Sequence, residues 1–335
     1  MPSDPRWHRL LLPMVSDCLP ESPTESVRAP AICARGLRKV YGAGVEALKG
    51  INLDIPAGSI FGLLGPNGAG KSTFIDILAG LVRKTSGQIE IWGHDIDTAR
   101  RSASNSIGIV PQELVIDPFF TPRESLENQA GYYGVPKVER RTDEILEAMG
   151  LADKAEAYTR RLSGGMRRRL MVAKAMVHAP PILVLDEPTA GVDVELRAQL
   201  WRYMRRLNDN GTTVLLTTHY LEEAEETCDR IAIIAGGEVV ACDETEALLN
   251  RLDYKEFALV LAEDVQEVPP ALTTFGATLE GNRRLMLHYR PSETRVTEIL
   301  AAVDNAGLVV ADISTHEPDL EDLFMELTAG ARRGG

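Results

Sequence analysis

The residues from Gly65 to Thr73 read Gly-Pro-Asn-Gly-Ala-Gly-Lys-Ser-Thr, and they constrain the fold of this chain more than any other stretch. They fit the pattern Gly-x4-Gly-Lys-[Ser/Thr], whose backbone N–H groups and lysine surround phosphate groups. The apolar run Ser59–Leu64 before them predicts a buried strand, and Phe74–Leu81 after them predicts a helix. A strand, a glycine loop and a helix N-terminus in this order predict a site for a polyanionic phosphate.

Within this loop each residue type has a chemical use. Gly65, Gly68 and Gly70 let the backbone turn and approach a ligand closely, because glycine has no Cβ. We expect Lys71 to pair with the β- and γ-phosphates and Ser72 to hold Mg²⁺. A glycine-rich turn without function is the alternative, and the flanking strand and helix disfavour it. The residues expected to contact the nucleotide here are Gly65, Pro66, Asn67, Gly68, Ala69, Gly70, Lys71, Ser72 and Thr73.

A second motif supplies carboxylates. The segment Pro181–Glu187 is an apolar run that ends in Asp186 and Glu187, and continuous apolar runs are typical of buried parallel strands. Carboxylates at the end of such a strand lie in the crevice where open α/β sheets bind ligands. Asp186 is expected to reach Mg²⁺, directly or through water, and Glu187 to accept a proton from the water that attacks the γ-phosphate. The alternative interpretation is that the two acids only cap the end of the strand and face solvent.

These motifs, followed along the chain with Leu162-Ser-Gly-Gly-Met166, resemble the ATP-binding cassette (ABC) ATPases over about residues 32–243. Ser163 suits a helix N-cap, and a Ser-Gly-Gly helix start is a second anion site. The resemblance implies that Ser163, Gly164 and Gly165 bind the γ-phosphate of an ATP held by a second subunit. It therefore implies a head-to-tail homodimer with two ATP molecules at the interface.

The resemblance also assigns roles to four residues outside these motifs. It places an adenine ring on Tyr41, and it gives Gln112 contacts with Mg²⁺, the attacking water and a membrane partner. It places Asp193 in a loop that communicates across the dimer, and it brings His219, after the strand Thr213–Thr218, to the γ-phosphate. Without the family pattern, Tyr41 reads as a structural residue and His219 as an ordinary polar residue at a strand end.

Some features narrow the family. Met166 stands where many members have Gln, and Gly191-Val192 replaces a commoner pair, which suits exporters better than importers. The ending Glu317–Phe324 resembles ATPases of drug, polysaccharide and nodulation-factor exporters. We therefore predict an ATP-hydrolysing motor for export through a separate permease. A soluble ABC ATPase acting on ribosomes or DNA, and a regulatory ATP sensor, are the alternatives.

Composition limits the partners. The net charge of −13 argues against nucleic-acid binding, which needs clustered Lys and Arg, and the basic run Arg167–Arg169 reads as a solvated helix face. No apolar stretch reaches the length of about 18 residues that a spanning helix requires, so the permease is expected to be another chain and this one peripheral at the cytoplasmic face of the membrane. The four cysteines do not have the spacing that is typical of metal sites, and they read as reduced cytosolic thiols. They are Cys18, Cys33, Cys228 and Cys242.

Alternating strands and helices predict an α/β fold with a parallel sheet. We expect a P-loop NTPase core with an antiparallel β layer and a helical subdomain, followed by a small C-terminal α/β domain. The expected parts are a flexible tail at 1–31, the ATPase domain at 32–243 with its helical subdomain at about 113–161, and the accessory domain at 244–330. Four aromatic residues near the start of the helical part read either as core or as a docking groove for the permease. They are Phe119, Phe120, Tyr132 and Tyr133.

Overall fold

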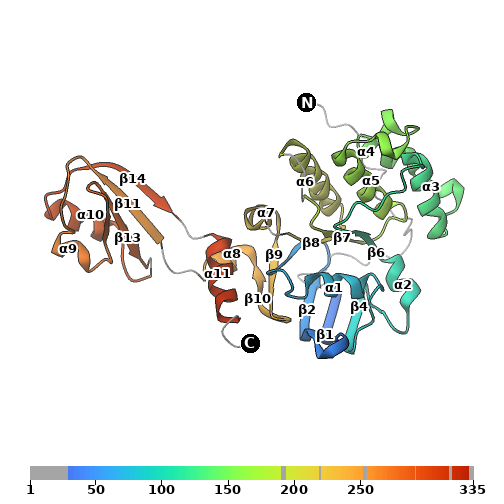
Figure 1. The fold of residues 1–335 in the computed structure, drawn as a ribbon, viewed down its shortest axis with the longest axis horizontal. Coiled ribbons are helices and arrows are strands. Elements are labelled where there is room, and N and C mark those ends of the chain that lie inside the picture. Colours follow the sequence, from blue (N-terminus) through green and yellow to red (C-terminus); the bar gives the residue numbers. More distant parts are fainter. Residues whose placement is uncertain are drawn as a thin grey trace, which may run out of the picture. The chain divides into compact units, whose positions relative to one another are not determined.

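The structure, a computed structural model, describes residues 29–189, 194–218, 220–251, 255–290, 292–316 and 319–331. The chain divides into two compact units between Cys242 and Asp243, and the second unit extends to Gly330. Figure 1 shows the course of the chain through both. Several predicted features lie outside the described residues: most of the tail, Gly191-Val192, Asp193, His219 and the start of the ending Glu317-Pro318.

An antiparallel sheet forms one layer of the first unit. Its strand order is β2-β1-β4-β5, and Ile32 of β1 pairs with Ile55 of β2 and with Ile91 of β4. The runs Ile32–Leu37 and Gly50–Ile55, whose sequences favour strands, lie within longer strands, β1 and β2, and β1 begins at Pro30, inside the expected tail. The bounds are β1 Pro30–Val40, β2 Glu46–Pro56, β4 Ser86–Ile91 and β5 His94–Asp95, with a 3-10 turn at Gly42–Gly44.

The second layer is a six-stranded sheet in the order β10-β9-β3-β8-β7-β6. The pairs β6–β7, β7–β8, β8–β3 and β3–β9 are all parallel, so the carboxyl ends of these strands meet at one edge. Every residue of β3 and of β8 is buried, which explains the apolar sequence of β3 and the apolar centre of β8. The bounds are β3 Ile60–Leu64, β6 Ile107–Val110, β7 Ile182–Asp186, β8 Thr213–Thr217, β9 Arg230–Ala235 and β10 Glu238–Glu244.

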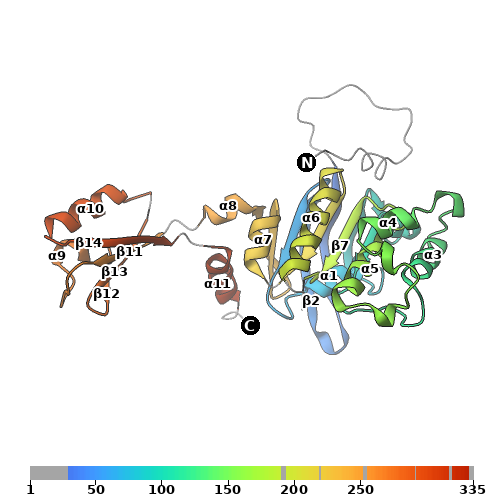
Figure 2. The ribbon, with the colours of Figure 1, turned by 90° about the horizontal axis from the view of Figure 1, so that it is seen from above.

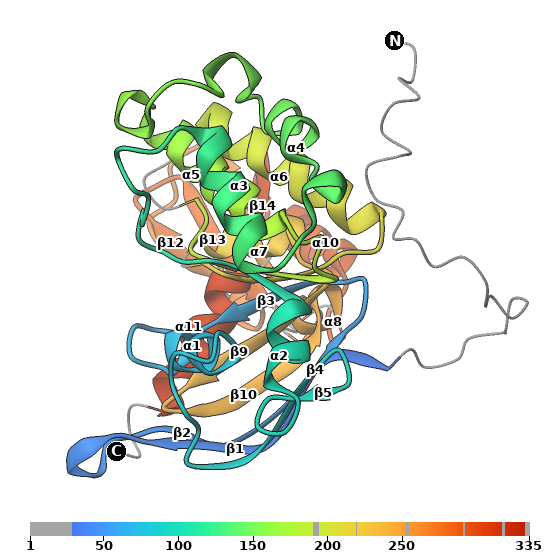
Figure 3. The same cartoon turned by 90° about the vertical axis from the view of Figure 1, so that its right-hand side faces the viewer.

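Helix α1 (Lys71–Leu78) joins the two sheets. Its Phe74 is fully buried in a core that also contains Leu48 of β2 and Phe61 of β3. The remaining helices of the parallel-sheet layer are α2 Arg100–Asn105, α5 Gly164–Met176, α6 Val194–Asp209 and α7 Leu221–Thr227. Figures 1 and 3 show α5 and α6 on the opposite side of the six-stranded sheet from the β1–β2 hairpin.

The helical subdomain is less helical than expected. The periodicity of the sequence favours helix from Glu113 to Gly134, and this expectation is wrong at its start, because helix α3 (Pro122–Tyr132) begins only at Pro122. Thr121 and Glu124 form a reciprocal capping box there, which fixes the helix start, and Pro118 lies in the irregular stretch before it. The other elements are α4 Thr142–Ala148 and 3-10 turns at Lys137–Glu139, Ala152–Lys154 and Thr159–Arg161.

The second unit contains an antiparallel sheet in the order β12-β13-β11-β14. Leu259 of β11 pairs with Leu285 of β13 and with Ile313 of β14. Helix α10 lies along this sheet, and its Ile299 and Val303 are buried in the unit's own apolar core (Figure 2). The bounds are α8 Thr245–Leu249, β11 Lys255–Leu261, α9 Pro270–Thr273, β12 Thr278–Glu280, β13 Arg284–Tyr289, α10 Val296–Asn305, β14 Val310–His316 and α11 Leu320–Ala331.

Candidate active site

The glycine loop connects β3 to α1, as the sequence predicts. Gly70 has φ +114°, and a Cβ there would lie 2.7 Å from the carbonyl oxygen of Ala47. A Cβ on Gly65 would lie 2.2 Å from the carbonyl oxygen of Ile234. The neighbouring strands β2 and β9 therefore require glycine at both positions. Gly68 has open space around it, and Asn67 and Gly68 are exposed, so the outer face of the loop is accessible to a ligand.

Lys71, the first residue of α1, folds back over the loop. Its side chain is only 9% exposed, and Nζ donates hydrogen bonds to the carbonyl oxygens of Gly65 at 2.5 Å and Pro66 at 3.2 Å. Burial lowers the pKa of Lys71, and the charges of Glu187 and Asp186 partly oppose that shift. The ammonium group is thus held inside the loop, within the electrostatic reach of both carboxylates.

Tyr41 lies beside this loop. Its hydroxyl is 3.4 Å from Oγ1 of Thr73, and Nζ of Lys39 lies 4.7 Å from the centroid of its ring. The Tyr41 side chain is 40% exposed, so the ring is available for stacking. Ser72, next to Thr73, is exposed as well. The structure therefore brings the predicted adenine-stacking residue to the predicted phosphate loop.

The two carboxylates follow β7, where the sequence places them. Oδ1 of Asp186 accepts a hydrogen bond from Oγ1 of Thr217 at 2.5 Å. The backbone N–H of Glu187 donates to the carbonyl oxygen and to Oγ1 of Thr217, at 3.1 and 3.0 Å. Glu187 has φ +47°, a left-handed conformation that is uncommon for glutamate. Thr217, at the end of β8, therefore fixes the backbone turn from which Glu187 projects.

Gln112 reaches Glu187 from the next strand. It lies two residues beyond the end of β6, and its Nε2 donates a hydrogen bond to Oε2 of Glu187 at 2.7 Å. Because β6 and β7 are parallel neighbours, both side chains project from the same edge of the sheet. The structure thus brings together Gln112 and Glu187, two of the three predicted catalytic residues.

The serine-glycine motif begins α5. Ser163 is the N-cap, and its hydroxyl accepts a hydrogen bond from the backbone N–H of Met166 at 3.3 Å. Ser163 and Gly164 are exposed, and a Cβ on Gly164 would meet nothing within 4 Å. Among the described residues, no hydrogen bond or ion pair links Ser163, Gly164 or Gly165 to the glycine loop. The motif therefore presents an exposed helix N-terminus at the surface.

The interpretation of Arg167–Arg169 as a solvated helix face is wrong. Arg168 is 4% exposed, and its guanidinium donates to the carbonyl oxygens of Pro111, Gln112, Glu187 and Pro188. Burial lowers its pKa. The spacing of residues along the helix could have predicted that Arg168 is buried, since Arg168 shares a face with residues 171, 172 and 175, which are all buried.

The other two arginines also bind carbonyl groups. Arg167 donates to the carbonyl oxygen of Leu162, one turn earlier. Arg169 donates to the carbonyl oxygens of Met149 and Gly150, which follow α4, and so ties α5 to the helical subdomain. The basic run therefore serves local structure, with a different target for each residue.

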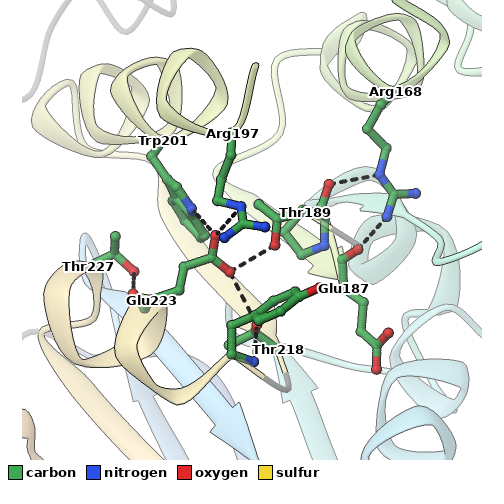
Figure 4. A network of polar contacts seen from close by, with 10 residues as sticks. Arg168, Glu187, Thr189, Arg197, Trp201, Thr218, Glu223 and Thr227 are labelled. Atoms are coloured by element: carbon green, nitrogen blue, oxygen red, sulfur yellow. Dashed lines mark hydrogen bonds and ion pairs between the residues drawn. The ribbon is translucent and has the colours of Figure 1, made fainter. Parts of the chain in front are cut away.

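Glu223 of α7 has a buried carboxylate, which makes four contacts that the sequence did not predict (Figure 4). Its Oε2 accepts hydrogen bonds from the hydroxyls of Thr189 at 2.8 Å and Thr218 at 3.2 Å. Its Oε1 accepts one from Nε1 of Trp201 at 2.5 Å and lies 3.9 Å from Nε of Arg197. Glu223 therefore joins α6 to the segments that follow β7 and β8.

The aromatic residues of the helical subdomain divide into two groups. Tyr133 packs in the structure, since its ring stacks on His178 with centroids 3.6 Å apart. Phe119, Phe120 and Tyr132 are exposed, by 68%, 41% and 86%.

In the part of the chain that the structure describes, we find no helix with the length and apolarity needed to cross a bilayer.

The fold and the site define a P-loop nucleotide-binding protein, and comparison with known proteins gives the family. The model of the ABC transporter family matches residues 48–190. The chain is 36% identical to the daunorubicin resistance ATP-binding protein DrrA3 of Streptomyces coeruleorubidus, over 90% of this chain and 97% of that protein. It is 35% identical to the linearmycin resistance ATP-binding protein LnrL of Bacillus subtilis, over 90% and 99%.

Two further similarities extend this result. The chain is 34% identical to the Nod factor export ATP-binding protein I of Ralstonia nicotianae, over 91% of this chain and 95% of that protein. Among solved structures, it resembles the dimeric post-hydrolysis state of the cassette MJ0796 bound to ADP and Pi. That match has a TM-score of 0.58 and 27% identity, over 64% of this chain and 98% of the other. The chain belongs to the ABC transporter family, as an ATP-binding subunit that hydrolyses ATP.

Proposed function

We propose that this subunit powers export, acting as a homodimer on a separate permease at the cytoplasmic face of the membrane. The observation that carries this proposal is the meeting of the glycine loop, Asp186 and the Gln112–Glu187 pair around one edge of the parallel sheet. Relatives named for drug resistance and Nod factor export support the direction of transport. They disfavour the alternative of a soluble ATPase acting on ribosomes or nucleic acid.

Lys71 and the loop are proposed to bind the phosphates of ATP. In this structure the Lys71 ammonium group donates hydrogen bonds to the carbonyl oxygens of Gly65 and Pro66. Phosphate oxygens carry full negative charge, so they are stronger acceptors than these carbonyls for a partly desolvated ammonium. The residues proposed to contact the nucleotide with Lys71 are Tyr41, Gly65, Pro66, Asn67, Gly68, Ala69, Gly70, Ser72 and Thr73.

Glu187 is proposed as the general base that takes a proton from the attacking water. Its carboxylate is oriented by the amide of Gln112, and its backbone by Thr217. A base must be held within hydrogen-bonding reach of the proton it removes, and these contacts restrict the side chain from both ends. His219 follows Thr218 in sequence, and we propose that it contacts the γ-phosphate.

Ser72, Gln112 and Asp186 are the proposed ligands of Mg²⁺. Their hydroxyl, amide and carboxylate oxygens are the hard donors that this cation prefers, so the residues present fit the ion. Bound there, Mg²⁺ would neutralise charge on the β- and γ-phosphates. The interaction of Asp186 with Thr217 orients the carboxylate independently of any metal.

Two surfaces are proposed to meet partners. Ser163, Gly164 and Gly165 present an exposed helix N-terminus that suits the γ-phosphate bound by a second copy, and Asp193 is proposed to lie at the same interface. Phe119 and Phe120, exposed beside the positively charged Arg160, are proposed to receive a short segment of the permease. We also infer that residues 244–330 are an accessory domain and residues 113–161 the permease-binding subdomain.

Tagged purification from native membranes in mild detergent tests this proposal. We expect a protein with several membrane spans to co-purify, and the complex to hydrolyse ATP. A matched purification of a Phe119→Asp variant controls for the docking surface and should lose the permease while keeping ATP binding. Recovery of the wild-type chain only with ribosomal or DNA-binding proteins would overturn the transport role.

A further inference from the structure

The contacts of Arg168 join three segments of the active site. Nη1 donates to the carbonyl oxygens of Pro111 at 3.1 Å and Gln112 at 2.8 Å, which follow β6. Nε donates to the carbonyl oxygen of Pro188 at 2.9 Å, and Nη2 to that of Glu187, both after β7. The last two bonds are visible in Figure 4, where the Glu187 carboxylate points away from Arg168. One side chain of α5 therefore holds the backbone of both Gln112 and Glu187.

Close packing of α5 on β6 makes this reach possible. A Cβ on Gly108 of β6 would lie 2.2 Å from the carbonyl oxygen of Ala175, so the helix and strand backbones approach at that point. Arg168 precedes Ala175 by seven residues, about 10 Å along a helix. Pro111 follows Gly108 by three residues, about 10 Å along a strand. The guanidinium thus arrives level with the ends of β6 and β7.

The same helix begins at the serine-glycine motif. Ser163 precedes Arg168 by five residues, which is about 7.5 Å along the helix. In the dimer of the proposed function, Ser163 serves the ATP held by the partner subunit, whereas Gln112 and Glu187 serve the ATP held by their own. Arg168 therefore connects the helix that begins at Ser163 to the backbone of Gln112 and Glu187, which are groups that face the two different ATP molecules.

We propose that Arg168 is a positioning residue that couples the two ATP sites of the dimer, by binding helix α5, which begins at the serine-glycine motif, to the backbone of Gln112 and Glu187. This inference rests on the proposed function. Because a guanidinium is planar and rigid, its four bonds fix the relative position of helix and strand ends. When a γ-phosphate draws Ser163 toward the partner subunit, the strand ends must follow or all four bonds must break.

The choice of arginine allows a sharp test. Lysine at position 168 keeps the charge but has only three N–H donors on a single nitrogen, so it cannot make the four bonds that the planar guanidinium makes to the two strand ends. The test compares the wild-type protein, Arg168→Lys, and the matched control Arg169→Lys, whose carbonyl partners lie after α4. For each protein we would measure ATP turnover against ATP concentration, the Hill coefficient, and the equilibrium affinity for a fluorescent ATP analogue.

In Arg168→Lys, we expect turnover to fall about tenfold, within the range usual for coupling between sites. The Hill coefficient should fall toward 1, while analogue affinity stays within about twofold, because the glycine loop is untouched. Arg169→Lys should behave as wild type in all three measurements. If Arg168→Lys does not fold by circular dichroism, Arg168→Gln, which keeps amide donors without charge, replaces it with the same expectation.

A wild-type Hill coefficient in a folded Arg168 variant would overturn the coupling role and leave the proposed function intact. An equal loss in Arg168→Lys and Arg169→Lys would also overturn it, since that would indicate general support of α5. A wild-type chain that hydrolyses ATP without cooperativity would contradict the two-site dimer itself, so the failures of the two proposals are distinguishable.

Discussion

The amide nitrogen of Gln112 lies 2.7 Å from Oε2 of Glu187, and this hydrogen bond links the ends of two neighbouring parallel strands. The residues are 75 positions apart in sequence, and Arg168 holds the carbonyl oxygens of both. Their side chains and their backbones are therefore fixed relative to each other by separate contacts. A proposed base and the residue proposed to sense the permease thus form one structural unit.

The first prediction concerns the base. Glu187→Gln should keep ATP affinity but lower turnover by about 10²–10⁴-fold, because an amide cannot accept the proton. The variant should then accumulate as a dimer with trapped ATP. Phosphate release and size-exclusion chromatography with ATP measure both effects. Glu113→Gln, an exposed neighbour of Gln112, is the control. Turnover near the wild-type value would remove Glu187 from this role.

The second prediction concerns pH and Lys71. Burial places the pKa of Lys71 below its ordinary value of 10.5. Binding of the ATP phosphates requires the charged form of the Lys71 side chain. ATP affinity should therefore be constant while Lys71 is protonated and should weaken as pH rises through the lowered pKa. Lys71→Arg, which stays charged, should abolish this alkaline loss, and Lys71→Ala should weaken binding at every pH by at least about tenfold. Equilibrium binding titrations from neutral to alkaline pH measure these differences.

Lys137→Ala, an exposed substitution on the helical subdomain, controls for loss of one positive charge. An alkaline loss of affinity that is identical in the wild type and in Lys71→Arg would show that another group titrates.

The third prediction concerns acid stability. Burial lowers the pKa of His178 to about 4 from 6.5, so between these values the unfolded chain binds a proton that the folded chain excludes. Stability is therefore lost as pH falls from 6.5 toward 4, by about 2–3 kcal/mol for a shift of this size in a partly exposed group. His178→Phe keeps a ring to stack on Tyr133 and should reduce this loss. Urea unfolding at pH 7 and pH 5 measures it, and an equal pH dependence in both proteins would contradict it.

The fourth prediction concerns the network around Glu223. Glu223→Ala leaves the buried hydroxyls of Thr189 and Thr218 and the half-buried indole of Trp201 without their acceptor, which should cost about 2–4 kcal/mol of unfolding free energy. Glu222→Ala, on the exposed face of the same helix, should change stability by less than about 0.5 kcal/mol. Denaturant unfolding, with Trp fluorescence as the signal, compares the two. Equal stabilities would show that the network contributes little.

The fifth prediction concerns the composite site. Gly164→Asp should fold normally, since the position is exposed and a Cβ meets nothing within 4 Å. Its carboxylate would repel the γ-phosphate of the partner, so ATP should still bind while dimerisation and turnover are lost. Gly131→Asp, on α3, introduces the same charge where a Cβ is also tolerated. Wild-type turnover in Gly164→Asp would argue against a site shared between subunits.

Local sequence patterns predicted three strands of the six-stranded sheet, β3, β7 and β8, because their apolar runs are bounded by glycine or acidic residues. The strand Pro181–Glu187 appears as Ile182–Asp186, and Thr213–Thr218 as Thr213–Thr217. Patterns failed where elements are short or amphipathicity is weak. The strands Ser86–Ile91 and Thr278–Glu280 were not predicted, and the expected helix at Glu113 is irregular chain up to Thr121. There, pairing with distant strands and one capping box decided the outcome.

The sequence by itself determined the glycine loop, the acidic strand end and the N-cap at Ser163, since each of these depends on residues that are neighbours in the chain. Only the tertiary structure decided that Gln112 meets Glu187, that Arg168 is buried, and that Glu223 gathers donors from three segments. Those contacts depend on which strands lie side by side and how closely α5 approaches β6. Spacing along the chain does not fix such distances, because they result from the packing of the whole core.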